Sequence, residues 1–274
     1  MAKRGIAGLA RRIQPLAQNI HDYFFAEMDY APRGWGGQSS NGWDDRAIAE
    51  AQAKHWPTLA RNVEGTGPLG VAHFPWCLGR EDRIHHNIMM SYGYVLARAA
   101  RNKDAISILD WGGGVGHYCL YSKALLPEVK FDYHCFDVPP MCEVGRKLLP
   151  EAHFYSEEAA LEGKTFDLVI SSSSLHYFEN WREAAQKLAA ASHDFLYVAR
   201  LQTVFSAPSF VAVQHADRKP YGDLRGWCLN QGELVSCLSD AGMQLLREFV
   251  YAKSWAVRGA PEKAETRGFL FRRR

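Results

Sequence analysis

The sequence has no long apolar run, no strong excess of charge of either sign and no cysteine pattern typical of secreted domains. No stretch is long enough to span a membrane, and the basic residues Lys3, Arg4, Arg11 and Arg12 precede too short an apolar segment for a signal peptide. The formal net charge of +2 lacks the strongly basic character typical of nucleic-acid-binding proteins. We therefore expect a cytoplasmic protein that binds neither membrane nor nucleic acid.

Cysteine and histidine spacing does not indicate a metal centre. The six cysteines, at positions 77, 119, 135, 142, 228 and 237, include no C-x-x-C pair. The adjacent histidines His85 and His86 would point in different directions on a helix, so they make a poor pair of ligands. We expect reduced thiols, no disulfide framework and no metal site.

The chain of 274 residues, 47% of them apolar, can hold one large domain, or one domain with an appendage. Residues 104–274 alternate strand and helix patterns, which predicts an α/β fold with a doubly wound, mainly parallel sheet. The strands are expected at Ile106–Asp110, Phe131–Asp137, His153–Tyr155, Phe166–Ile170, Asp194–Arg200, Gln244–Tyr251 and Arg267–Arg272. The helices are expected at His117–Leu126, Met141–Leu149, Trp181–Ala191 and from Asn230 to about Ala241. The last two strands are too close for an intervening helix and should form an antiparallel hairpin.

Residues 1–103 differ in pattern from the rest of the chain. Helical periodicity occurs near Ile6–Met28, Asp44–Asn62 and Arg83–Asn102, between glycine- and tryptophan-rich loops. We expect an N-terminal helical cap that packs on the domain of residues 104–274 and lines a substrate pocket. The segment Leu201–Trp227 is long for a connection and is expected to be a lid or binding loop.

The most informative motif follows the first strand, where Ile106 to Gly116 read I-S-I-L-D-W-G-G-G-V-G. Asp110 precedes glycines that let the backbone bend and let a ligand lie against it. The loop leads into a helix N-terminus, whose free N–H groups favour an anion. A dinucleotide-binding G-x-G-x-x-G loop would need glycine at position 117, which is His117. The alternative is a plain glycine turn in another α/β domain.

Two further sets of polar residues follow later strands. Asp137 ends the second strand, where its carboxylate can accept hydrogen bonds from two ribose hydroxyls or can cap the helix that begins at Pro139. Ser171 to Ser174, then Leu175 and His176, follow the fourth strand, and burying four serines is costly unless they line a polar cavity. His176 is the candidate general base, because histidine titrates near neutrality, although it could also only pack on a ligand.

These motifs together resemble class I S-adenosylmethionine-dependent methyltransferases over about residues 104–274. The segments that carry the resemblance are L-D-W-G-G-G-V-G, the acid Asp137, F-D-L-V-I-S-S-S-S-L-H-Y and L-V-S-C-L-S-D-A-G-M-Q-L-L. The resemblance implies a seven-stranded sheet of order 3-2-1-4-5-7-6 with one antiparallel strand. It implies S-adenosylmethionine as cofactor, held by Asp110, Gly112, Gly113, Gly114, Gly116, Asp137, Val138, Ser156, Ser171 and Ser172.

More narrowly, the cap and the helix Arg83–Asn102 resemble a bacterial methyltransferase family often encoded beside cell-surface polysaccharide assembly genes. This resemblance implies an enzyme that methylates an oxygen or nitrogen of a small molecule, for example a saccharide or another biosynthetic intermediate. The alternatives are a non-catalytic, cofactor-binding interaction module on the same fold and an NAD(P)-dependent oxidoreductase. The oligomeric state stays open, with a homodimer among the options.

Overall fold

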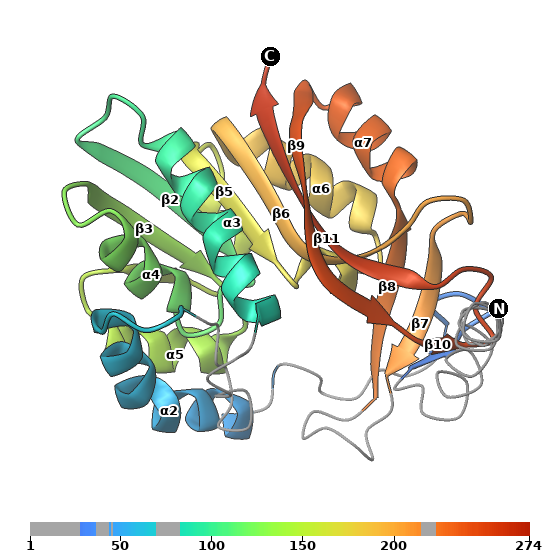
Figure 1. The fold of residues 1–274 in the computed structure, drawn as a ribbon, viewed down its shortest axis with the longest axis horizontal. Helices are drawn as coiled ribbons and strands as arrows, with labels where there is room; N and C mark the ends of the chain where they lie inside the picture. Colours follow the sequence, from blue (N-terminus) through green and yellow to red (C-terminus); the bar gives the residue numbers. More distant parts are fainter. Residues whose placement is uncertain (1–27, 37–43, 45, 70–82, 215–222) are drawn as a thin grey trace, which may run out of the picture.

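The computed structural model describes residues 28–36, 44, 46–69, 83–214 and 223–274. Its centre is a mixed sheet with helices on both faces (Figure 1). Seven strands form the part predicted from the sequence: β2 (Ala105–Trp111), β3 (Lys130–Phe136), β4 (His153–Tyr155), β5 (Phe166–Ser172), β6 (Ser192–Val204), β9 (Met243–Trp255) and β11 (Ala264–Arg273).

The order of these seven strands is β4-β3-β2-β5-β6-β11-β9, which is the predicted order. Strands β2 to β6 pair in parallel, and β11 runs antiparallel to both β6 and β9. The direction of winding reverses between β2 and β5. In open α/β sheets, ligands bind outside the carboxyl ends of the strands at this switch point.

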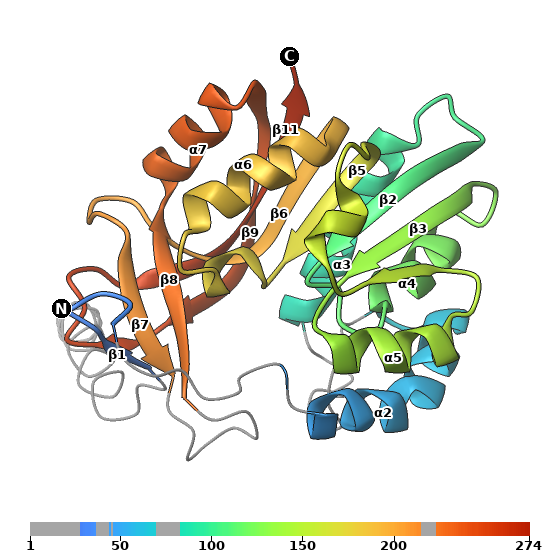
Figure 2. The ribbon, with the colours of Figure 1, turned by 180° about the vertical axis from the view of Figure 1, so that it is seen from behind.

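Helices cover the two faces of the sheet and bury two separate apolar clusters. On one face lie α2 (Arg46–Glu64), α3 (Arg83–Ala99), α4 (His117–Leu125) and α5 (Pro139–Leu148), which share a core with Ile106 and Ile108 (Figure 1). On the other face, α6 (Trp181–Ala191) and α7 (Gln231–Asp240) pack around Leu109 and Trp111 (Figure 2). The alternation along β2 therefore sends Asp110 to the first face and Trp111 to the second.

Four further strands extend the sheet beyond the predicted seven. They are β1 (Met28–Tyr30), β7 (Phe210–Gln214), β8 (Leu224–Asn230) and β10 (Val257–Arg258). β8 pairs in parallel with the end of β6 and antiparallel with β7, which in turn pairs with β1. The prediction that Leu201–Trp227 is a loop is therefore wrong for most of its described part, because its apolar residues pair as strands and form a third small core with Met28.

The described part of residues 1–103 is mostly helical, as predicted, but begins with strand β1. The predicted helices Asp44–Asn62 and Arg83–Asn102 correspond to α2 and α3. Residues 6–27 of the predicted helix Ile6–Met28 lie outside the described residues, and Met28 belongs to β1. No helix of the described residues combines the length and apolar character that a membrane crossing requires. The cysteines in the described ranges are free.

Candidate active site

The glycine loop lies at the switch point, between β2 and α4. Gly116 has a φ of 95°, in the left-handed region, and a Cβ there would lie 2.7 Å from Cδ1 of Leu149. A Cβ on Gly113 would lie 2.5 Å from Oδ2 of Asp110 and 2.8 Å from Sγ of Cys135. Gly113 therefore packs closely on β2 and β3, and Gly116 packs on Leu149 after α5 and on Phe154 of β4, so only glycine fits at these two positions.

Asp137 holds this loop in place from the end of β3. Its Oδ2 accepts a hydrogen bond from the Gly114 amide at 2.6 Å, and its Oδ1 accepts one from the Val138 amide at 2.7 Å. Burial raises the pKa of Asp137 to about 6, although both amide hydrogen bonds oppose that shift. Each carboxylate oxygen has a second lone pair, so Asp137 can still accept hydrogen bonds from ligand hydroxyls.

Asp110 is a fully buried acid at the end of β2. The Tyr133 hydroxyl donates to its Oδ2 at 2.5 Å, whereas Oδ1 has no hydrogen-bond partner among the described residues. Burial and, less strongly, the charge of Asp137 raise the pKa of Asp110 to about 7, so the carboxyl is only partly ionised at neutral pH. A cation bound beside Asp110 would favour its ionised form.

The four serines do not share one environment. Oγ of Ser171, which is fully buried, bonds to Oγ of Ser174 at 2.7 Å, and Ser174 donates to the Trp111 carbonyl at 2.6 Å. Ser172 bonds to the Tyr118 hydroxyl at 2.8 Å. Alternation along β5 places Ser172 on the Asp110 face and Ser171 on the Trp111 face, so the structure separates two residues that were predicted together.

His176 lies in the short helix η4 (Leu175–Tyr177) and is 1% exposed. Within the described part of the chain, its Nδ1 is a buried atom with no hydrogen-bond partner. Burial, and to a lesser degree Arg200, lowers the pKa of His176 to about 3. The ring is therefore neutral at neutral pH and has a lone pair that can accept a proton. The low pKa means that the ring would bind this proton weakly.

The remaining predicted residues lie around the loop. Gly112 donates its amide hydrogen to the Phe136 carbonyl at 2.7 Å, and Val138 precedes α5 with its side chain partly buried. Ser156 follows β4 and is partly exposed. The carboxyl ends of β2, β3 and β5 thus bring the glycine loop, Asp110, Asp137 and Ser172 to one edge of the sheet.

Sequence reasoning missed Gln52 and Arg200. Gln52 is 5% exposed on α2, and its Oε1 would lie 3.1 Å from a Cβ on Gly114; that oxygen has no hydrogen-bond partner in the described ranges. The sequence pattern that could have identified Gln52 is its position as a polar residue at helical spacing between the apolar residues Ile48 and Trp56. Arg200 has a φ of 54°, which is unusual for a residue with a side chain and is a form of strain found at functional sites. No local pattern predicts that conformation.

Residues 85–248 match a family model described as a methyltransferase domain. The match covers more than half of the chain, and the chain belongs to this methyltransferase family. The match agrees with the class of S-adenosylmethionine-dependent methyltransferases that the sequence resemblance implied. The match is to the methyltransferase domain in general, and not to the narrower bacterial family linked to polysaccharide assembly genes. No curated protein sequence matches the chain.

Several solved structures are similar to this chain. One S-adenosylmethionine-dependent methyltransferase from Methanosarcina mazei is 14% identical with a TM-score of 0.48, covering 62% of this chain and 93% of that chain. The 1,6-didemethyltoxoflavin-N1-methyltransferase of Burkholderia thailandensis, with bound S-adenosylhomocysteine, is 14% identical with a TM-score of 0.47, covering 88% and 93%. Magnesium protoporphyrin IX methyltransferase from Synechocystis, with bound S-adenosylhomocysteine, is 15% identical with a TM-score of 0.47, covering 84% and 100%. These likenesses carry no argument about substrate.

The residues at the switch point fit S-adenosylmethionine. A side chain on Gly113 would collide with Asp110, and one on Gly114 would press on Gln52, so the backbone of the loop stays bare. The buried Oδ1 of Asp110 lacks a hydrogen-bond donor among the described residues. A cofactor with a positive sulfur and an ammonium group suits a site with two buried acids, because each cation would favour their ionised forms.

Proposed function

We propose that this enzyme methylates an oxygen or nitrogen of a small molecule, with a saccharide hydroxyl or amine as the first candidate. The observation that carries the proposal is the burial of polar side chains on α4 and η4, which follow β2 and β5. His176 is 1% exposed and Tyr118 is 4% exposed. A Cβ on Gly226 of β8 would lie 3.2 Å from Cδ2 of His176, so β8 packs closely against this side chain. Such an enclosed set of side chains suits a small acceptor better than a macromolecular chain.

In the proposed site, Asp137 binds the ribose and Val138 packs on the adenine. Asp110 lies near the amino end of the methionine moiety, and the amides of Gly112, Gly113, Gly114 and Gly116 form the loop. Ser156 and Ser172 complete the contacts, whereas Ser171, on the Trp111 face, positions Ser174 instead. When bound, S-adenosylmethionine supplies a methyl group already activated on a positive sulfur. The protein then has to align the acceptor, exclude water and remove one proton.

We propose that the proton is accepted at His176, whose neutral ring carries a lone pair. We also assign residues 1–103 as the cap and substrate region, and residues 104–274 as the methyltransferase domain. The approach of Gln52 to the glycine loop supports that assignment. The free, mostly buried thiols support a cytoplasmic location.

The first experiment is a calorimetric titration of the protein with S-adenosylmethionine and S-adenosylhomocysteine, with NADH as the negative control. Asp137→Ala should weaken binding by about 1.5–3 kcal/mol, roughly 10- to 150-fold, because charged hydrogen bonds are lost. The control is Asp240→Ala, an exposed acid at the end of α7, which should bind as the wild type does. Unchanged affinity in Asp137→Ala would remove Asp137 from the ribose contact.

The acceptor is tested by measuring S-adenosylhomocysteine release with panels of saccharides, amines, phenols, protein and RNA. Turnover with a small molecule is the expected result. Methyl transfer only to protein or RNA would contradict the proposal. Tight cofactor binding without transfer to any member of the panels would favour the non-catalytic alternative.

A further inference from the structure

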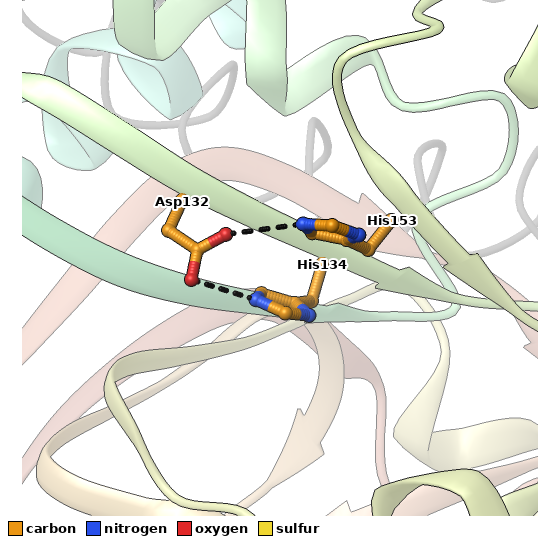
Figure 3. A group of neighbouring side chains, drawn as sticks. All are labelled: Asp132, His134 and His153. Atoms are coloured by element: carbon orange, nitrogen blue, oxygen red, sulfur yellow. Dashed lines mark ion pairs between the residues drawn. The ribbon is translucent and has the colours of Figure 1, made fainter.

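A second cluster of chemically active side chains lies at the edge strands, outside the proposed methyl-transfer site. Asp132 and His134 belong to β3, and His153 belongs to β4, the last strand at that edge. His134 and His153 face each other in the parallel register of the two strands. Residues far apart in the sequence are thus brought together by strand pairing (Figure 3).

The donor atoms of these three residues converge. Nε2 of His134 lies 3.0 Å from Oδ2 of Asp132, and Nε2 of His153 lies 3.4 Å from Oδ1 of the same carboxylate. One ligand atom from each of the three residues lies within 4.8 Å of the other two. Ligands at the usual zinc distances of about 2.0–2.2 Å are separated from one another by roughly 3–3.5 Å in tetrahedral geometry. The two distances from Asp132 oxygens to histidine nitrogens, 3.0 and 3.4 Å, fall in that range.

Outer contacts orient His134. Its Nδ1 lies 3.0 Å from the Tyr155 hydroxyl oxygen, which also accepts a hydrogen bond from Lys164 at 3.3 Å. A proton on Nδ1 that is donated to this oxygen leaves Nε2 with its lone pair toward Asp132, as metal-binding histidines require. The neutral ring is the form that binds a metal.

A comparable cluster at the amino ends of β5 and β6 differs from the Asp132 cluster in having a lysine beside it. Asp167, His193 and Asp194 also group together. There the Lys103 ammonium bonds to both carboxylates, at 2.7 Å each, so the chain supplies its own cation. Within the described residues, the ion pairs of Asp132 are with the two histidines alone.

We propose that Asp132, His134 and His153 bind a divalent transition metal ion, with Zn²⁺ as the expected ion. One carboxylate and two imidazoles are a common zinc donor set, and it satisfies three of four tetrahedral positions. Asp132 and His153 are exposed, with 60% and 56% of their side-chain surfaces accessible, so water can complete the coordination. The ion would bridge β3 and β4 next to Tyr155, which precedes Ser156.

The test is a calorimetric titration of the full chain with Zn²⁺, after treatment with a chelator and removal of any purification tag. One Zn²⁺ should bind with a dissociation constant of micromolar or below, and His153→Ala and Asp132→Asn should each weaken binding by about 10- to 100-fold. Both positions are exposed, so these variants should fold, which circular dichroism checks. His193→Ala is the matched control, an exposed histidine in the cluster that Lys103 neutralises, and it should bind Zn²⁺ as the wild type does.

A second readout is the thermal stability of the same proteins. Zn²⁺ at a hundredfold excess over its dissociation constant should raise the melting temperature of the wild type and of His193→Ala, but raise it much less for His153→Ala. Saturable binding that is unchanged in His153→Ala and Asp132→Asn would overturn the proposal. So would the lack of saturable binding below about 100 µM.

Discussion

The site combines buried acids and buried histidines whose pKa values are shifted in opposite senses. Burial raises the pKa of Asp110 to about 7 and that of Asp137 to about 6, while it lowers the pKa of His176 to about 3. In each case burial disfavours the charged form. At neutral pH, these three side chains therefore carry less charge than they could hold. A cationic cofactor would favour ionisation of the two acids.

At the residue scale, His176→Ala should lower the turnover number more than the affinity for the cofactor. If the ring accepts the proton, turnover at saturating substrate should fall about 10²- to 10⁴-fold, while the dissociation constant of S-adenosylhomocysteine changes little. Steady-state kinetics and calorimetry measure the two quantities separately. His176→Gln serves as the second variant, because glutamine can fill and orient but cannot accept the proton. A normal rate in either variant would remove His176 as the base.

At the element scale, the last strand secures the ends of two helices. Arg273 of β11 donates to the Ser192 carbonyl at 3.0 Å and to the Ala241 carbonyl at 2.8 Å, and it also contacts the Ala189 carbonyl. These carbonyls lie at the C-terminal ends of α6 and α7, where a cation is favourable and unpaired carbonyl groups need donors. A single side chain thus connects the antiparallel strand to the helical layer on the Trp111 face.

Arg273→Met should therefore lower the free energy of unfolding by about 2–4 kcal/mol, because several partly buried hydrogen bonds to a charged donor are lost. Urea unfolding monitored by circular dichroism gives this value. Arg272→Met is the control, since Arg272 is exposed on the same strand, and its effect should stay within about 0.5 kcal/mol. Equal destabilisation by both variants would mean that the loss comes from the strand and not from the helix ends.

At the scale of the whole molecule, four buried groups make stability respond to pH in opposing directions. The lowered pKa values of His117, about 4, and His176 cost stability as the pH falls below the unfolded value of about 6.5. The raised pKa values of Asp110 and Asp137 act the other way, because the folded protein takes up protons there first. The free energy of unfolding of the wild type should therefore change less with pH than the two histidines alone, or the two acids alone, would make it change.

Removing one histidine should unbalance these contributions. Between pH 7 and 5, the wild type should lose about 2 kcal/mol of stability relative to His117→Gln, because only the wild type has to keep this imidazole neutral in the fold. Urea unfolding at several pH values measures the difference. His193→Gln is the control, since that imidazole has 67% of its side chain exposed. Parallel curves for wild type and His117→Gln would contradict the depressed pKa of His117.

Much of the fold follows from local sequence patterns. Short apolar runs predict β2 to β6, and helical periodicity predicts α4 to α7, because these signals depend on residues a few positions apart. The D-x-G-x-G-x-G spacing likewise identifies the loop and its acid, because these residues follow one another directly in the chain, although Leu149 and Phe154, which exclude a side chain at Gly116, are distant in the sequence. The seven-strand order came from the family resemblance and is confirmed by the strand pairing.

The sequence by itself determined the alternation of elements, the glycine loop and the class of enzyme. Only the tertiary structure decided that the segment after Leu201 pairs as strands, that Gln52 reaches the loop from α2, and that His134 and His153 meet beside Asp132. The physical reason is separation along the chain. Helices, strands and tight turns depend on residues a few positions apart, so their patterns can be recognised in the sequence. Strand pairing and helix docking bring together distant residues, and these contacts do not change the periodicity of either segment.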